Sequence, residues 1–456
     1  MGPSLRVRDC RLHYIPISMS LPLSFGRASL RDLECLRVRM TVEDSSGRTY
    51  DGWGEVPLNI AWAWPEAPRD AWTRQAVRSF CSRIAQRWCA LDLRGHALEL
   101  GHRFLTGELT ALASEARTTF HIGAFPRRMA LLCAAPFDIA LHDAYGRAAG
   151  LPTYETYGPE HLTRDLSSYF GPEARRFVGR YPADYLLFRR PERIAAWHLV
   201  GCSDAVEAPA DEPAPGDRPR SVVQWIARDG VTRLKIKVCA EDRESDVRRL
   251  LRVGAVAEKY GVQELSVDFN GTAPSESYVT TLLERLAVEA PTVYDRLRFV
   301  EQPFAPGSAV EAEGVRAVSE LKPVYVDEGA GCWQEVRAAW QAGYAGVALK
   351  TCKTQTAAVL SACWAREHGM GVIVQDLTNP MLAQVAHVLL AAHVAPEMGV
   401  ESNSMQFCPE ASEPEARVHP GLYRRTGGML DLSTVGGPGF GYRVEEIRRE
   451  LPEDAA

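Results

Sequence analysis

The sequence lacks several features that would place it in a specialised class of proteins. No apolar run approaches the roughly 20 residues of a membrane-spanning helix, and the N-terminal residues carry charges early and then alternate like a strand. We therefore expect neither a membrane span nor a signal peptide. The 11 cysteines are scattered and include no CxxC pair, which favours reduced thiols in the cytoplasm over a disulfide framework or a zinc site. The net charge of −6 is mild and spread out, unlike the basic surface of a nucleic-acid binder.

What remains is an ordinary globular composition. The chain has 456 residues, of which 46% are hydrophobic and 24% charged, enough to build a substantial core. This length exceeds that of a typical single domain and predicts two domains.

The first 160 residues predict a small α+β domain. Apolar and polar residues alternate over residues 6–16, 33–43 and 48–55, which predicts three strands, and helical spacing follows over residues 69–88 and 129–149. Two connecting stretches, residues 21–26 and 56–64, are apolar yet interrupted by proline or glycine. They either pack in a satellite core or cap a binding pocket.

From about residue 166 the chain alternates short strands with helices, the pattern of a parallel (β/α)8 barrel. We expect the barrel over residues 161–407, with strands at residues 166–170, 233–238, 264–268, 297–301, 323–328, 346–350, 371–375 and 397–401. The stretch 171–220 is long for a connection inside a compact domain, and such connections are usually functional or disordered. We predict that its first part helps to cover the site and that its second part, around residues 208–216, is mobile.

The second predicted barrel strand carries two lysines on one face. Lys235 and Lys237 alternate with Leu234, Ile236 and Val238, so both ammonium groups point into the barrel if the aliphatic face meets the helices. Adjacent ammonium groups lower each other's pKa, which favours a lysine that acts as a base. Alternatively, the lysines form the polar face of an edge strand, where they discourage aggregation.

Three acids close the next three predicted strands. Asp268, Glu301 and Asp327 stand at strand ends and point to one place, and Lys350 ends the strand that follows. Converging carboxylates repel one another unless a cation lies between them, and oxygen ligands with open positions suit Mg²⁺. A single aspartate at a strand end is usually a helix cap, but three in succession beside lysines favour a magnesium site.

Two further strings resemble signatures of the enolase superfamily, in particular the mandelate racemase and muconate lactonizing enzyme group: Gly52-Trp-Gly-Glu55 and the helix-ending residues 137–152. With the barrel pattern, the resemblance covers nearly the whole chain and indicates the muconate-lactonizing-type subgroup, which has two active-site lysines. It implies an enolase-like barrel with an N-terminal capping domain over residues 1–160, a C-terminal segment over residues 408–456 that returns to the cap, and a homo-oligomer. Two departures concern substrate identity: Lys353-Thr354-Gln355 replaces the usual Gly-Gly, and Gly329 replaces a common serine.

The resemblance also implies roles for individual residues. Asp268, Glu301 and Asp327 match the Mg²⁺ ligands, and Lys237 and Lys350 match the acid/base lysines on opposite faces of the substrate. Positions beside the ligands are matched by Asn270, Gln302 and Glu328.

These residues predict removal of the proton next to a substrate carboxylate, with Mg²⁺ stabilising the enediolate. Lys237, with its pKa lowered by Lys235 and the metal, would take the proton, and Lys350 could return one from the opposite face. Two lysines suit a racemase, an epimerase or a cycloisomerase acting on a small carboxylate. A syn-eliminating dehydratase or lyase is an alternative, although the histidine of one related dehydratase group is missing from strand seven, since His368 precedes that strand. A catalytically retired barrel that only binds a ligand is the second alternative.

Four more residues are candidates for substrate contact. Glu401 and Asn403, at the end of the eighth strand, either meet a polar or cationic part of the substrate or make turn hydrogen bonds. Trp62 and Trp64, in the apolar stretch 56–64, are expected to contact its distal end.

Overall fold

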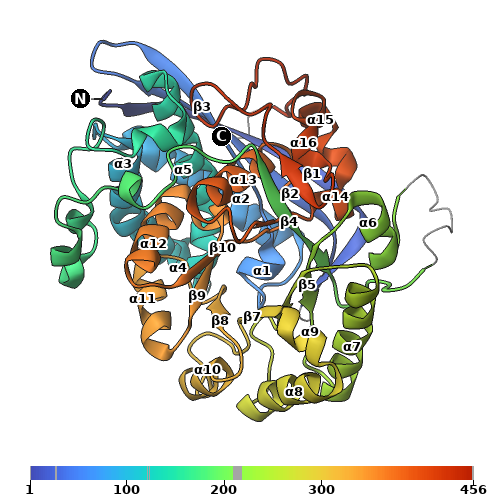
Figure 1. Cartoon of the computed structure of the whole chain (residues 1–456). Helices are drawn as coiled ribbons and strands as arrows, with labels where there is room; N and C mark the ends of the chain where they lie inside the picture. The colour runs from blue at the N-terminus through green and yellow to red at the C-terminus, as the bar shows by residue number, and fades with distance from the viewer. Residues whose placement is uncertain (1, 26–27, 121, 123, 209–217, 454–456) are drawn as a thin grey trace.

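The structure is a computed structural model that describes residues 2–25, 28–120, 122, 124–208 and 218–453. An N-terminal α+β domain, blue to teal in Figure 1, packs against a barrel of parallel strands surrounded by helices. The enolase-like fold predicted from the sequence is confirmed. No helix within these ranges is long and apolar enough to cross a membrane, and the eleven cysteines, all in described positions, are free thiols.

The capping domain is built on one antiparallel sheet of order β1-β2-β3. Its strands are β1 (Arg6–Phe25), β2 (Ala28–Glu43) and β3 (Thr49–Pro57), and its helices are α1 (Ile60–Ala63), α2 (Ala71–Ala90), α3 (Ala97–Arg103), α4 (Leu109–Thr119) and α5 (Arg127–Ala149), with a π-helical turn at Phe104–Glu108. Residues 21–25, expected to be a loop, instead extend β1, because Leu23, Ser24 and Phe25 pair with β2. Residues 56–64 include the short helix α1.

The glycines of the Gly52-Trp-Gly-Glu55 string allow β3 to lie directly on α5. A side chain at Gly52 would collide with the backbone of Ala140, and one at Gly54 with the backbone of Pro136. The string therefore fixes how the sheet of the cap sits on its longest helix.

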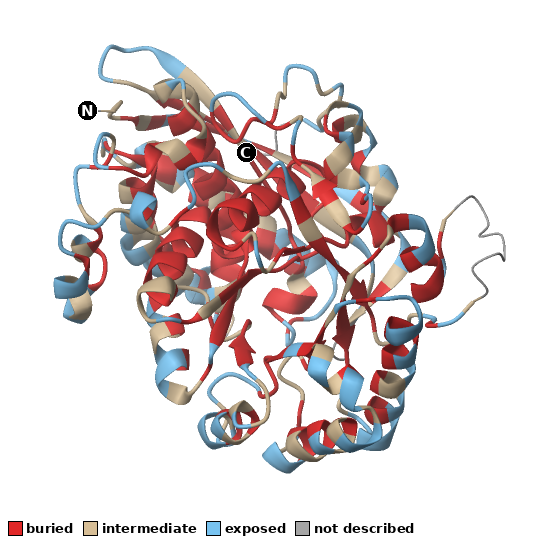
Figure 2. Ribbon diagram, viewed as in Figure 1, coloured by how far each residue is buried: buried red, intermediate tan, exposed pale blue. Residues whose placement is uncertain are grey.

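Within the described ranges the barrel has eight parallel strands, and β11 pairs with β4 to close it. The strands are β4 (Arg193–Val200), β5 (Arg233–Lys237), β6 (Glu264–Asp268), β7 (Leu297–Glu301), β8 (Val324–Val326), β9 (Gly346–Leu349), β10 (Gly371–Val374) and β11 (Val400–Glu401). The helices between them are α6 (Val222–Asp229), α7 (Arg243–Lys259), α8 (Glu276–Glu289), α9 (Pro291–Arg296), α10 (Glu311–Ser319), α11 (Trp333–Ala342), α12 (Gln355–Glu367) and α13 (Met381–Val394). Figure 2 shows that the strands and α13 are buried, whereas the outer helices expose one face.

The first barrel strand is not where the sequence pattern placed it. Residues 166–168 form a 3-10 turn, and Arg193–Val200 is the strand that pairs with both β5 and β11. Residues 171–192 therefore precede the barrel, where Glu173 contacts Arg337 of α11 and His368 after α12. The prediction that they help to cover the site is wrong, because they lead into the start of β4, at the opposite end from the site. The expectation for residues 208–216 falls, except for Ala208, outside the described residues.

The C-terminal segment contains α14 (Ser404–Phe407), α15 (Glu413–Val418), α16 (Pro420–Tyr423) and β12 (Met429–Asp431), which pairs antiparallel with the start of β4. It contacts the capping domain through buried polar groups. Arg37 of β2 bonds to both Glu55 and Glu415, and the Phe440 amide donates to Asp143 of α5 at 2.8 Å.

The lower part of the barrel interior is filled by aromatic and aliphatic side chains. Phe299 stacks on Tyr325 with ring centroids 4.5 Å apart and meets Trp197 at 5.9 Å. The lysines and acids of the barrel interior gather beyond this layer, at the carboxyl ends of the strands.

Candidate active site

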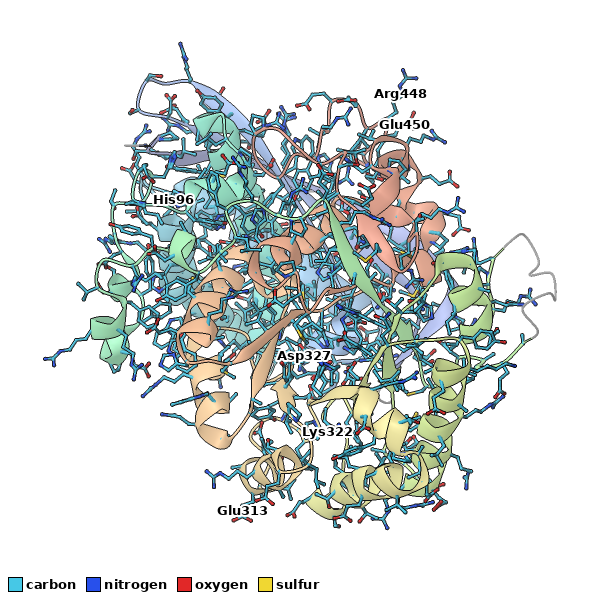
Figure 3. All side chains as sticks on the ribbon, viewed as in Figure 1. His96, Glu313, Lys322, Asp327, Arg448 and Glu450 are labelled. Carbon is cyan, nitrogen blue, oxygen red and sulfur yellow. The ribbon has the colours of Figure 1, made fainter. Side chains whose placement is uncertain are left out.

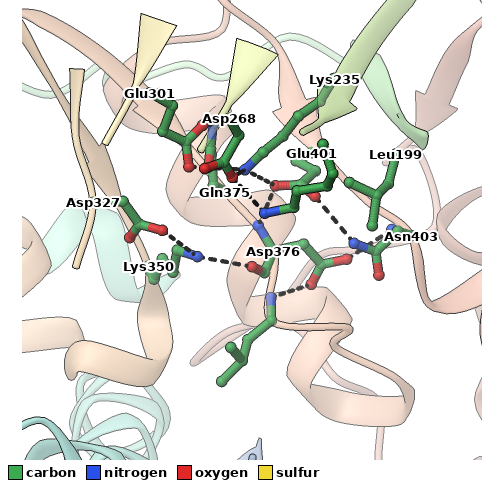
Figure 4. Close-up of polar contacts among 12 residues, drawn as sticks. Leu199, Lys235, Asp268, Glu301, Asp327, Lys350, Gln375, Asp376, Glu401 and Asn403 are labelled. Atoms are coloured by element: carbon green, nitrogen blue, oxygen red, sulfur yellow. Dashed lines mark hydrogen bonds and ion pairs between the residues drawn. The ribbon is translucent and has the colours of Figure 1, made fainter. Parts of the chain in front are cut away.

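The two lysines of β5 both point into the barrel and are buried, which confirms the strand parity expected from the alternation. The ammonium of Lys235 bonds to Glu301 Oε1 at 2.8 Å and Glu401 Oε2 at 3.1 Å, and lies 3.0 Å from Asp268 Oδ2 (Figure 4). Lys235 is therefore the central cation of the cluster, shared by acids from three strands.

Lys237, one step further along β5, stands at the rim of the barrel. Its ammonium donates to Asp268 and, at 2.9 Å, to Asn270 Oδ1. Asn270 adopts a left-handed backbone conformation, with φ of 46°, and its amide donates to Asp268 Oδ1 at 2.8 Å. The turn after β6 thus folds back to hold Lys237.

Lys350 approaches from the other side of the barrel, directly after β9. Its ammonium lies 2.9 Å from Asp327 Oδ2 and donates to the carbonyl of Asp376 at 3.1 Å. Lys237 and Lys350 line one cavity, and each has its own aspartate. Figure 3 shows Asp327 in the middle of the barrel, whereas Lys322 and Glu313 lie out by the helices.

A fourth buried lysine belongs to this centre. Lys353 donates to Asp327 Oδ1 at 2.9 Å and to the Asp327 carbonyl at 2.6 Å. Lys353 is one of the departures from the family pattern, and no role was predicted for it from the sequence. The feature of the sequence that could have indicated a role is its position, one 3-10 turn (Thr351–Lys353) after Lys350 at the end of the strand.

The three acids end neighbouring strands, as expected. Asp268 is directly paired with Glu301 in the sheet, and Glu301 with Tyr325, two residues before Asp327. All three carboxyl groups are buried.

The residues that end or follow β10 and β11 form a second cluster of polar side chains. The side chain of Asn403 donates to Glu401 Oε1 at 3.1 Å, and its amide donates to Asp376 Oδ2 at 2.7 Å. Gln375 bridges Lys235 and Glu301. Gln375 and Asp376 were not predicted as site residues, although both directly follow a barrel strand, the position at which such barrels carry their functional residues.

The cap closes the cavity from above. Trp62 lines it, donates from Nε1 to Glu328 Oε1 at 3.2 Å, and has its ring centroid 5.2 Å from the Lys350 ammonium. Leu23 and Phe25 of the long hairpin also line it, so this apolar stretch covers the pocket. Trp64 does not line the cavity and packs instead against Phe125 with ring centroids 5.4 Å apart.

A family model described as enolase C-terminal domain-like matches residues 218–448, half of the chain. The chain belongs to the enolase superfamily. Within this superfamily of enzymes it falls in the mandelate racemase and muconate lactonizing enzyme group, as the sequence motifs indicated. The muconate-lactonizing-type subgroup stays a prediction.

Solved structures show the same fold at low sequence identity. The 2-chloromuconate cycloisomerase of Rhodococcus opacus 1CP has a TM-score of 0.63 and 18% identity, covering 98% of this chain and 100% of its own. A dipeptide epimerase of Enterococcus faecalis V583, complexed with Mg and the dipeptide L-Leu-L-Tyr, has a TM-score of 0.62 and 16% identity, covering 96% and 99%. A mandelate racemase/muconate lactonizing protein of Herpetosiphon aurantiacus has a TM-score of 0.61 and 17% identity, covering 96% and 98%. A comparison with curated proteins gives no match.

Two residues that directly follow the acids, Gln302 and Glu328, hold the ends of the strands in place. Gln302 Oε1 accepts from the Asp327 amide at 2.8 Å, and its Nε2 donates to the Phe304 carbonyl at 2.8 Å. Glu328 Oε1 accepts from Asn270 as well as from Trp62, both at 3.2 Å. Gln302 therefore ties the end of β7 to that of β8, and Glu328 ties the cap to the barrel.

The charges of the centre determine its protonation. Burial alone would lower the pKa of Lys235, but the nearby carboxylates of Asp268, Glu301 and Glu401 outweigh it and raise that pKa well above its ordinary value. Burial would also lower the pKa of Lys350, but the carboxylate of Asp327 outweighs burial and raises that pKa above its ordinary value. The expectation that neighbouring ammonium groups lower each other's pKa therefore does not hold for Lys235. The alternation of residues along one strand does not show that acids from other strands surround this lysine.

Within the described parts of the chain, no three histidine, cysteine or acidic side chains stand close enough to hold a metal ion as they are placed. Lysine ammonium groups lie between the carboxylates instead. The donor set nevertheless fits Mg²⁺ in kind, because it offers carboxylate oxygens from three adjacent strands. The centre also holds more acids than lysines; the acids are Asp268, Glu301, Asp327, Glu328, Asp376 and Glu401, and the lysines are Lys235, Lys237, Lys350 and Lys353. Burial and the charge of Asp268 raise the pKa of Glu301 well above its ordinary value, a further mark of uncompensated negative charge.

Proposed function

We propose that the protein is a Mg²⁺-dependent enzyme that removes the α-proton of a small carboxylate substrate to give an enediolate, and that it works as a racemase, epimerase or cycloisomerase. The observation that supports this most strongly is the placement of Lys237 and Lys350. They stand on opposite sides of one cavity, each beside a different aspartate, with Asp268, Glu301 and Asp327 closing the strands between them.

Mg²⁺, held by Asp268, Glu301 and Asp327, would supply a Lewis acid that draws charge from the substrate carboxylate. It would also offset the negative charge of the carboxylates that raise the pKa values of Lys235 and Lys350, and so favour the neutral, basic form of these two lysines.

The residues of the chain divide the remaining tasks. Lys237 accepts the α-proton, and Asn270 fixes the position of its nitrogen. Lys350 delivers or removes a proton on the opposite face, where Asp327 and the Asp376 carbonyl orient it. Trp62 and the hairpin residues Leu23 and Phe25 exclude water from this space.

Exchange of the α-proton with solvent deuterium tests this proposal directly. The purified protein is incubated in D₂O with Mg²⁺ and a library of α-substituted acids and dipeptides, the latter because a similar epimerase is described with a bound dipeptide, and loss of the α-proton signal is followed by NMR. We expect exchange that disappears when Mg²⁺ is chelated.

The products separate the reaction types. Inversion indicates a racemase or epimerase, whereas a new double bond indicates the syn-eliminating lyase that the same two lysines would also serve. No exchange with any acid in the library would leave the barrel as a binding protein and overturn the proposal.

A further inference from the structure

A second, larger cavity adjoins the active site on the outer side of Trp62. It lies between α1 and the start of α5 in the cap and the loops after β6, β7 and β8 of the barrel, and it measures about 970 Å³. Phe25, Trp62 and Asn270 line both cavities. We call the two spaces the inner and outer chambers.

The sizes of the chambers indicate how a substrate divides between them. The inner chamber measures about 40 Å³, and since one water needs about 10–15 Å³ by the same measure, this is space for about three water-sized groups. A carboxylate and its α-carbon fill that volume. The rest of a larger acid therefore extends past Trp62 into the outer chamber.

The cations that line the outer chamber differ in whether they have a hydrogen-bond or ion-pair partner. Arg127 is paired with Glu335 at 3.1 Å, Lys353 with Asp327 at 2.9 Å, and Arg69 donates to a backbone carbonyl at 3.4 Å. Arg128 has neither a hydrogen-bond acceptor nor an acidic partner among the residues that the structure describes, and its Nε is buried without a partner.

Arg128 is nevertheless held at the boundary of the two chambers. Its Cζ lies 5.1 Å from the ring centroid of Trp62, and Trp62 is itself fixed by its bond to Glu328. Arg128 also stands in the first turn of α5, a helix of 23 residues whose N-cap, Pro126, offers no capping side chain. The unpaired amides and the helix dipole at this end favour an anion as well.

The acids of the outer chamber leave this cation uncompensated. Glu335 is taken by Arg127, and Glu328 accepts from Trp62 and Asn270. Glu66 also lines the chamber, but its side chain is exposed to solvent and forms neither a hydrogen bond nor an ion pair with Arg128. A half-buried guanidinium without an anionic partner is costly unless a ligand supplies one.

We propose that Arg128 binds a second anionic group at the distal end of the substrate, so that the substrate class is acids that carry another carboxylate or an equivalent anion beyond the α-carbon. This inference rests on the proposed function for the position of the reacting carboxylate. The planar fork of Arg128 suits a carboxylate bound through two parallel hydrogen bonds.

Matched pairs of probes test this assignment. Each α-substituted acid with a distal carboxylate is compared with its distal primary amide, which has nearly the same shape and no charge. In the exchange assay we expect kcat/KM to favour the carboxylate by about 10- to 100-fold, the range of a charge-assisted hydrogen-bonded contact. Arg128→Gln should bring the ratio close to one, Arg128→Lys should restore part of it, and Arg127→Gln should leave it unchanged.

A binding measurement keeps the inference separate from turnover. Titration calorimetry with Mg²⁺ compares glutarate with its monoamide, on the wild type and on Arg128→Gln, after circular dichroism shows that the variant is folded. Tighter binding of glutarate that depends on Arg128 supports the inference even if no acid exchanges, an outcome that would refute only the catalytic function. Exchange without preference for the distal carboxylate, or equal or absent binding of both probes, would overturn the inference and leave the catalytic proposal standing.

Discussion

Replacement of the three lysines of the inner chamber by methionine should separate the roles of catalysis and folding. Lys237→Met removes one of two cations from Asp268, but Lys235 stays 3.0 Å from that carboxylate. Lys350→Met removes one of two cations from Asp327, and Lys353 stays at 2.9 Å. Neither change leaves a buried acid without a counter-charge, so we expect each to lower the free energy of unfolding by only about 2 kcal/mol.

Lys235→Met is different because this ammonium is shared by Asp268, Glu301 and Glu401. Its removal leaves at least two buried carboxylates without a close cation, and loss of a buried ionic partner costs about 3–5 kcal/mol. We expect this variant to be clearly destabilised, and to regain part of its stability when Mg²⁺ is added.

The activity of the first two variants should fall far more than their stability. A general base contributes about 10² to 10⁴ in rate, which corresponds to roughly 3–5 kcal/mol of activation free energy. In a racemase, Lys237→Met should abolish exchange from one enantiomer and Lys350→Met from the other.

The assays are α-proton exchange in D₂O for each enantiomer and urea unfolding, with Lys259→Met on the exposed face of α7 as the control. Exchange by Lys237→Met at the wild-type rate, or unfolding of this variant as readily as Lys235→Met, would refute these roles.

Three further predictions concern the cap, the metal and pH. Trp62→Phe removes the bond to Glu328 and should lower kcat/KM about tenfold, whereas Trp64→Phe, away from the cavity, should change the melting temperature and not the kinetics; similar kinetic losses in both would contradict this. Saturating Mg²⁺ should stabilise the wild type by about 3 kcal/mol at 100 times its dissociation constant, and Glu301→Gln should lose most of that gain in thermal unfolding scans; an equal gain in the variant would remove Glu301 from the ligand set. Burial raises the pKa of Asp143 from 3.8 to about 7, so the folded state binds the proton more tightly; the stability that this group contributes is full below pH 4 and is lost as the pH rises to 7, on the order of 3–4 kcal/mol. Urea titrations of the wild type and Asp143→Asn between pH 4 and 7.5 should show a shallower fall in the variant, and parallel curves would contradict the assignment.

The centre of the site was predictable because its signals are local. Alternation around Lys235 fixed which face of β5 points inward, and the acids at the ends of three successive strands needed only the barrel pattern to be brought together. No partner from another part of the chain had to be known.

The parts that failed depend on contacts between distant segments. Residues 166–170 and 193–200 are both short apolar runs, and only pairing with β5 and β11 decides which becomes a strand. Trp62 and Trp64 stand two residues apart in one apolar stretch, yet the short helix α1 brings one to the cavity and the other into the core. The same limit applies to the pKa of Lys235, which is set by acids from three other strands.

The anchoring of the tail bears on protein engineering. Asp143 of α5 accepts hydrogen bonds from Trp53 of β3 and Phe440 near the end of the chain, and Arg37 joins the cap sheet to α15. The lid of this enzyme is thus assembled from both extremities of the polypeptide. A chimera that takes its capping domain from a relative must therefore also take the C-terminal segment from that relative. If only one of the two were exchanged, buried donors and acceptors such as Arg37 and Asp143 would lose their partners.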